Sequence, residues 1–155
     1  MAKMRKVILA TVGVVLIVTF IVPAIVDAGS LKIWPDQLKP TSPAFSYVQP
    51  GFLVSNGTFY APVALPSGSR VVKLSYYHRG TSAQASTALS IVRMQMGNAS
   101  ELMGSQSSTD ATGTVIPVDV SITGDPIIKK GYRYYVVVSA DNTSSNVQGV
   151  KIVYE

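Results

Sequence analysis

Cysteine is absent from the 155 residues, and histidine occurs only once, as His78. Without cysteine the chain cannot form a disulfide framework, a thiolate zinc site, an iron–sulfur cluster or a thiol nucleophile. Charged residues are also few, at 14%, against 47% hydrophobic residues. This composition is too apolar for intrinsic disorder, and the length predicts a single domain with its own core.

Glycine-rich phosphate loops are missing as well. Neither G-x-G-x-x-G nor G-x-x-x-x-G-K occurs, so no nucleotide cofactor is expected. The only adjacent basic pair after residue 30 is Lys129-Lys130, too small a cluster for a nucleic acid partner. The oxygen-rich run from Asp141 to Asn146 lacks the spacing and glycine of an EF-hand, and it favours a hairpin over a calcium site. The sequence thus predicts no cofactor and no metal.

The first 30 residues differ from the rest of the chain. Three basic residues within the first six precede a charge-free run over residues 7–26, which small residues follow. This pattern is typical of a secretory signal peptide over residues 1–28. The alternative is a retained membrane anchor, because residues 7–26 are long enough to span a bilayer. Both interpretations export the remainder, so we expect an extracellular or cell-surface protein that touches the membrane only through residues 7–26, if they are not cleaved off.

Residues 29–43 contain three prolines and no regular period, which predicts a Pro-rich spacer with an extended bias. Trp34 lies within this segment. Packing onto the domain is the expected role for so large an apolar side chain, and a surface anchor is the alternative.

From residue 44 onward, apolar and polar residues alternate with period two, which predicts β-strands. Val72, Leu74, Tyr76 and His78 are expected on one face of a strand, and similar alternation occupies residues 116–122, 132–139 and 150–154. Pro117 predicts an edge or a bulge. Turn residues separate these runs, and there is neither a helical period nor an internal repeat.

About eight such strands predict an all-β fold, an antiparallel two-sheet sandwich that is jelly-roll-like, over residues 44–155. An immunoglobulin-type topology is the alternative, although its cysteine pair is absent.

Catalytic chemistry has few candidates. A Ser-His-Asp triad would need His78, but no G-x-S-x-G elbow occurs, and we expect a histidine at the rim of the sheet with a hydrogen-bond partner. Two carboxylates facing each other across a cleft could hydrolyse glycosides. Most acids occupy turns, and Asp119, in mid-strand on the exposed face, is expected to keep an edge soluble. The acids after residue 30 are Asp36, Glu101, Asp110, Asp119, Asp125, Asp141 and Glu155. The sequence does not predict an enzyme.

Outward-facing strand residues are the predicted contact surface. Aromatic and arginine side chains on a flat sheet favour stacking on sugar rings or contact with another subunit. Against this, tyrosine is common in half-buried strands, and a bulge would invert the assigned face. The predicted contact residues are Lys73, Tyr77, Arg79, Arg133 and Tyr135. Asn56, Asn98 and Asn142 begin N-x-S/T motifs in predicted turns, which would be glycosylated only if the source organism modifies exported proteins.

Four runs of the sequence carry a resemblance to known proteins: residues 59–68, 71–77, 132–138 and 147–154. With these runs the chain resembles a loose group of secreted bacterial β-sandwich proteins over residues 45–155. The resemblance implies an exported sandwich with a short tether, and it brings no catalytic residues.

Together these patterns favour a non-catalytic surface protein that is structural or adhesive. It would self-associate through its sheet edges or bind other surface components, and Ala44 to Gln49 could pair with a neighbour's sheet edge. A carbohydrate-binding module, with glycans as partners, is the alternative. A small hydrolase using His78 ranks third.

Overall fold

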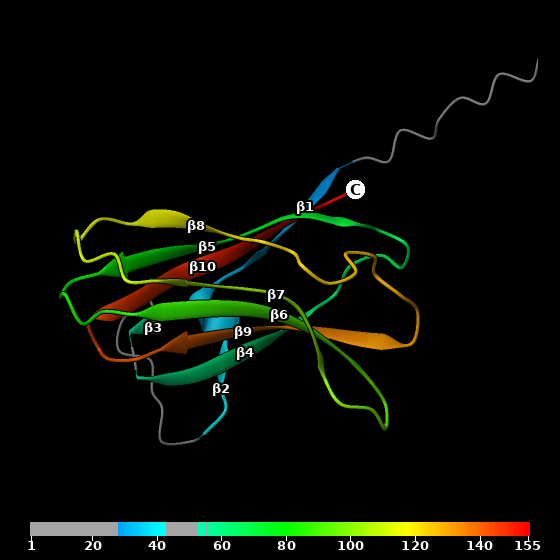
Figure 1. The fold of residues 1–155 in the computed structure, drawn as a ribbon, viewed down its shortest axis with the longest axis horizontal. Coiled ribbons are helices and arrows are strands. Elements are labelled where there is room, and N and C mark those ends of the chain that lie inside the picture. Colours follow the sequence, from blue (N-terminus) through cyan, green and yellow to red (C-terminus); the bar gives the residue numbers. More distant parts are fainter. Residues whose placement is uncertain (1–27, 43–52, 55) are drawn as a thin grey trace, which may run out of the picture.

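The alternating runs of the sequence form the strands of two antiparallel sheets (Figure 1). The computed structural model describes residues 28–42, 53–54 and 56–155. Sheet A contains, in spatial order, β1 (Gly29–Ile33), β10 (Ser145–Tyr154), β5 (Val71–Gly80) and β8 (Ile116–Val120), and β3 (Leu53–Val54) also pairs with β10. Sheet B contains β2 (Lys39–Pro40), β4 (Gly57–Val63), β9 (Tyr132–Ala140), β6 (Thr87–Gln95) and β7 (Glu101–Ser108). The predicted two-sheet antiparallel sandwich is confirmed.

The core lies between the sheets and is built from every second residue of the long strands. Each sheet covers one side of it, so period-two alternation turns apolar side chains inward and polar ones outward. The predicted inward faces of 116–122 and 132–139 are confirmed, and Pro117 lies on β8, an edge strand of sheet A. Fully buried core residues include Phe59, Leu74, Tyr76, Leu89, Ile91, Val136, Val138 and Ile152.

At the start of β5 the predicted faces are reversed. Val71 is buried, whereas Val72, expected on the inner face, is 46% exposed. The cause is a register irregularity between β5 and β10, where Lys73 pairs with Val153 but Val71 pairs with Tyr154. Val72 is therefore the extra residue of a bulge, and a bulge changes which face the preceding residue occupies.

His78 lies inside the core and not at its rim. Its side chain is fully buried, with Nε2 2.9 Å from the Asp110 carbonyl oxygen and Nδ1 3.0 Å from Thr87 Oγ1. Because a carbonyl only accepts, Nε2 carries the proton and donates it, while Nδ1 shares a hydrogen bond with the threonine hydroxyl, which also lies 3.3 Å from the Tyr76 hydroxyl oxygen. The predicted hydrogen-bond partner is thus confirmed, and the predicted rim position is wrong.

The same threonine joins the two sheets. Thr87 belongs to β6 of sheet B, whereas Tyr76 and His78 belong to β5 of sheet A. Tyr76 donates its hydroxyl proton to the Thr87 carbonyl oxygen at 3.2 Å. Burial raises the pKa of Tyr76, since the charged phenolate would be poorly solvated there. Buried polar groups with partners in both sheets hold the sheets in one relative position.

The segment expected as a Pro-rich spacer belongs to the sandwich. Residues 29–33 form β1, which pairs along its whole length with β10, and Lys39 and Pro40 pair with β4 of the other sheet. A single turn of 3-10 helix, η1 (Pro35–Gln37), joins these two strands. Pro35 therefore begins the crossing between the sheets, and the described sandwich begins at Gly29.

Two predicted segments lie outside the described residues. They are the signal or anchor segment, except for Ala28, and Ala44 to Gln49. Among the residues that the structure describes, no helix is both long and apolar enough to cross a bilayer.

Thr87→Val is expected to destabilise the fold by about 1–3 kcal/mol, because it removes the hydroxyl that satisfies the buried His78 Nδ1. Urea denaturation followed by circular dichroism measures the change. Ser90→Ala, on the same strand but bonded only to the exposed Ser105, is the matched control and should stay within about 0.5 kcal/mol of the parent. Equal stabilities of the two variants would contradict the role given to Thr87.

Candidate functional site

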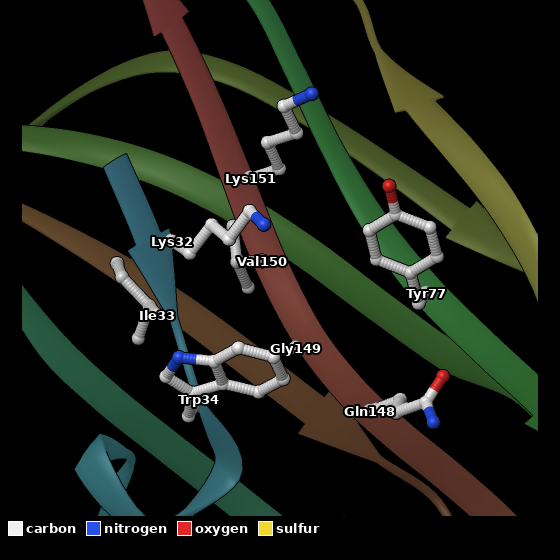
Figure 2. A pocket seen from close by; sticks show the side chains of 8 residues that line it. All are labelled: Lys32, Ile33, Trp34, Tyr77, Gln148, Gly149, Val150 and Lys151. Carbon is white, nitrogen blue, oxygen red and sulfur yellow. The ribbon is translucent and has the colours of Figure 1, made fainter. Parts of the chain in front are cut away.

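A hollow of about 270 Å³ opens on the outer face of sheet A, where β1, β10 and β5 lie side by side (Figure 2). Two aromatic side chains, two lysines and a glutamine border it, and the backbone of β10 forms its floor. The lining residues are Lys32, Ile33, Trp34, Tyr77, Gln148, Gly149, Val150 and Lys151.

The floor of the hollow is a β-bulge. Val147 pairs with His78 and Gly149 pairs with Tyr77, so Gln148 is an extra residue without a partner on β5. Bulges re-aim side chains, and here the bulge sets Gln148 at the border of the hollow. Gly149 has a φ of +153°, and a Cβ built on it would lie 2.9 Å from the Ile33 carbonyl oxygen. Glycine thus allows the close approach of β1 and leaves the floor without a side chain.

Trp34 and Tyr77 lie on the two sides of this glycine (Figure 2). Trp34 follows Ile33, whose partner on β10 is Val150, so Trp34 comes beside Gly149 on one flank while Tyr77 pairs with it on the other. Trp34 is 56% exposed. The expected packing of this indole onto the domain is therefore wrong, and its outward position follows from Ile33 pointing inward.

Two lysines occupy opposed positions on neighbouring strands beside the aromatic pair. Lys32 on β1 and Lys151 on β10 are direct register partners. Among the described residues, neither ammonium group has a carboxylate within 4.0 Å, whereas Lys73 lies 3.0 Å from Asp119. Ser75 Oγ also donates to Asp119 at 2.7 Å, and this bond lowers the pKa of Asp119 more than the lysine does. The negative charge on this face is thus already neutralised by Lys73.

The five predicted contact residues are divided between two faces. Lys73, Tyr77 and Arg79 lie on β5 in sheet A, and only Tyr77 lines the hollow. Arg133 and Tyr135 lie on β9 in sheet B, where the Tyr135 ring meets Tyr60 edge-on at 6.3 Å between centroids. They border a broader depression with Lys129 and Lys130.

Arg93 organises a charged cluster that the sequence did not predict. Its guanidinium donates to Glu101 at 2.7 and 2.9 Å and to Asp125 at 3.3 Å, and it lies 5.4 Å from the centroid of the Tyr132 ring. Lys129 also binds Asp125, at 2.6 Å. Hydrogen bonds from Lys129, the Ile127 amide and Arg93 lower the pKa of Asp125 to about 2. The cluster links β6 and β7 to the loop before β9. Its positive and negative groups neutralise one another.

The three asparagine motifs lie in different surroundings. Asn142 donates to the Gln84 carbonyl oxygen at 2.7 Å and accepts from the Ser144 amide at 2.8 Å, which closes the turn between β9 and β10. The turn at residues 141–144 leads from β9 of sheet B to β10 of sheet A, and Ser145 and Asn146 already belong to β10, so the hairpin predicted from Asp141 to Asn146 is wrong. Asn98 lies exposed in the turn between β6 and β7 and donates to Gln95, and Asn56 lies exposed before β4. Among the described residues no group of three His, Asp or Glu side chains could hold a metal ion.

No protein-family model matches the chain, and no curated protein sequence matches it. Solved structures are similar to it in fold. The CBM36-1 domain of a multidomain xylanase from the hindgut metagenome of Trinervitermes trinervoides has a TM-score of 0.50 at 13% identity, over 80% of this chain and 96% of that one. The C-terminal CBM6 of a marine laminarinase from Zobellia galactanivorans has a TM-score of 0.46 at 12% identity, over 80% and 98% of the two chains. The chain therefore has a jelly-roll-like β-sandwich fold similar to that of the CBM36-1 domain.

Gly149→Ala is expected to destabilise the fold by about 1–3 kcal/mol, because an added Cβ meets the Ile33 carbonyl oxygen in a conformation that alanine disfavours. Gly68→Ala is the control, since Gly68 also has a positive φ, +92°, but open space around it. Thermal unfolding of both variants measures the contribution of the contact. A loss no larger at Gly149 than at Gly68 would contradict the close approach of β1.

Asp125→Asn is expected to lower stability at pH 7 and to lose this effect in acid. A carboxyl whose folded pKa lies below its unfolded value of about 3.9 stabilises the fold above that value, and the contribution disappears as the pH falls from about 4 to about 2. Denaturation curves at pH 7, 4 and 2.5 measure the difference from the parent. Asp141→Asn, which changes an exposed turn residue, should stay within about 0.5 kcal/mol of the parent at pH 7.

Proposed function

We propose that this protein is a non-catalytic module that binds carbohydrate through the hollow between Trp34 and Tyr77. The observation that carries the proposal is a row of three residues across neighbouring segments: Trp34, which directly follows β1, Gly149 on β10 and Tyr77 on β5. A sugar ring has an apolar face that packs on aromatic side chains. The bare glycine between the two aromatic residues leaves room for it.

The polar border of the hollow suits the rest of a sugar. Hydroxyl groups around a stacked ring need donors and acceptors, which the Gln148 amide, the Tyr77 hydroxyl and two lysines supply. The fold is compatible, because the CBM36-1 domain has the same architecture. Together, a flat aromatic surface and hydrogen-bonding groups at its edge support carbohydrate binding without catalysis.

The geometry gives little support to hydrolysis. Both ring nitrogens of His78 are occupied inside the core, so the imidazole does not reach a substrate. A glycosidase general acid needs a raised pKa. Instead, the pKa of Asp110 is lowered by the Thr112 amide, and those of Asp119 and Asp125 are lowered by their own partners. These carboxylates are held in their charged form.

Self-assembly through sheet edges remains the second proposal, and the edges offer it less support. Gly104 of β7 bridges to Ile122 just beyond β8, so the edge strands of the two sheets meet there. On the opposite side, η1 connects β1 and β2, the outer strands of sheets A and B. Covered or short edges hinder strand addition by a second copy. Light scattering measures the oligomeric state, and stable oligomers would support this second proposal.

Trp34→Ala is expected to weaken binding to a glycan at least roughly tenfold, because it removes the larger stacking surface. A glycan array with the parent protein identifies the glycan, and isothermal titration calorimetry then measures affinity. Since the indole is more than half exposed, the melting temperature should change little.

Tyr135→Ala is the matched control for this test, since it removes an aromatic ring from the opposite face of the sandwich. It should leave glycan affinity unchanged. The proposal is wrong if the array detects no glycan, or if Tyr135→Ala abolishes binding while Trp34→Ala does not.

A further inference from the structure

We infer that the glycan of this site is acidic, carrying the carboxylate of a uronic acid, which Lys32 and Lys151 bind. The inference rests on the proposed carbohydrate binding and names its ligand class. It is carried by a feature that the stacking argument does not use, namely the direct pairing of two lysines on neighbouring strands.

Opposed lysines are unfavourable for the fold alone. Side chains of register partners lie about 5 Å apart at Cβ, and like charges in that position repel. Elsewhere on sheet A the structure avoids this, since Ser75 pairs with Asp119 and Lys73 neutralises the carboxylate. No carboxylate plays that part for Lys32 or Lys151 among the described residues. An anion held between the two ammonium groups would relieve the repulsion.

The register places this pair at a fixed distance from the aromatic row. Lys32 on β1 precedes Trp34, which directly follows that strand, by two residues, and Lys151 follows Gly149 by two on β10. Two residues along a strand correspond to roughly 7 Å, and both positions face the same side of the sheet. A flexible lysine stem covers such a distance. In Figure 2 the Lys32 side chain extends over β10 and the Lys151 side chain extends away from Gly149, so rotation of the flexible Lys151 stem would bring both ammonium groups to the edge of a ring stacked over the glycine floor.

A uronic acid fits this arrangement better than a sulfate ester. Its carboxylate is attached directly to a ring carbon, so the charge stays at the edge of the stacked ring. A sulfate is carried on a rotatable ester oxygen and does not share a fixed position with the ring. The neighbouring Asp119 carboxylate, two strands from Lys151, is already bound by Lys73 and Ser75.

Calorimetry with polygalacturonate, alginate and glucuronan, each compared with its methyl ester, tests the inference. Esterification removes the charge and keeps the sugar backbone. The acid form of at least one is expected to bind at least tenfold more tightly than its ester, with an affinity that falls as salt is added. Lys32→Gln and Lys151→Gln should each weaken that binding roughly tenfold, because a charge-assisted hydrogen bond is lost.

The control is the double variant Lys39→Gln/Lys130→Gln, which removes two exposed charges away from sheet A and should leave the affinity unchanged. Lys32→Gln should also melt no lower than the parent, since it relieves repulsion in the free protein. A lower melting temperature would contradict the repulsion argument.

Other outcomes separate the two proposals. Equal binding of acids and esters, dependent on Trp34, would overturn the acidic ligand and keep carbohydrate binding. Binding of dextran sulfate but of no uronic acid would overturn the assignment of a carboxylate. If neither these polymers nor any glycan of the array binds, the proposed function itself is wrong.

Discussion

Strand β10 forms hydrogen-bonded ladders with β1 on one side and with β5 on the other, and this double pairing positions every part of the hollow. One ladder sets Lys151 opposite Lys32 and brings Trp34 beside Gly149. The other sets Tyr77 opposite the same glycine. Since hydrogen-bonded strands lie about 4.8 Å apart, the backbone fixes the spacing of the Cα atoms that carry the aromatic and cationic side chains. These attachment points are therefore as rigid as the sheet.

The inner faces of the long strands could be predicted because each sheet buries one face, so apolar residues recur at every second position. Tyr134, Val136 and Val138 point inward as their alternation requires. Bulges could not be predicted, because an extra residue is defined only against its partner strand. Val72 and Gln148 are such residues, and neither has a local sequence signal apart from the glycine that follows Gln148.

The lining of the hollow was predicted only in part. Tyr77, predicted to point outward, lines the hollow, but Arg133 and Tyr135 were grouped with it although they lie on the opposite sheet. Strand β1 was missed because five residues next to three prolines are too short for a period to emerge. The pairing of β1 with β10 brings together Lys32, Trp34 and Lys151. It joins residues about 120 positions apart, so composition and local spacing could not predict it.

Two kinds of polar group stabilise the sandwich in different ways. The buried Tyr76, Thr87 and His78 bond across the core and favour one alignment of the sheets. The cluster around Arg93 lies at the surface and depends on charge, so it is sensitive to pH and salt. Neither cluster borders the hollow, and the groups that stabilise the fold are thus separate from those proposed to bind.

The pairing of the first and last described strands has a mechanical consequence. Gly29, at the start of β1, is the partner of Tyr154, at the end of β10, so both ends of the described chain leave from one end of the same ladder. A tensile load applied between them would act across the ladder from one end. The backbone hydrogen bonds would therefore break one after another and not all at once. Strand β1 would peel away before the rest of the sandwich, taking Lys32 and Trp34 with it. Tension along the chain would therefore dismantle the hollow while most of the core remained folded.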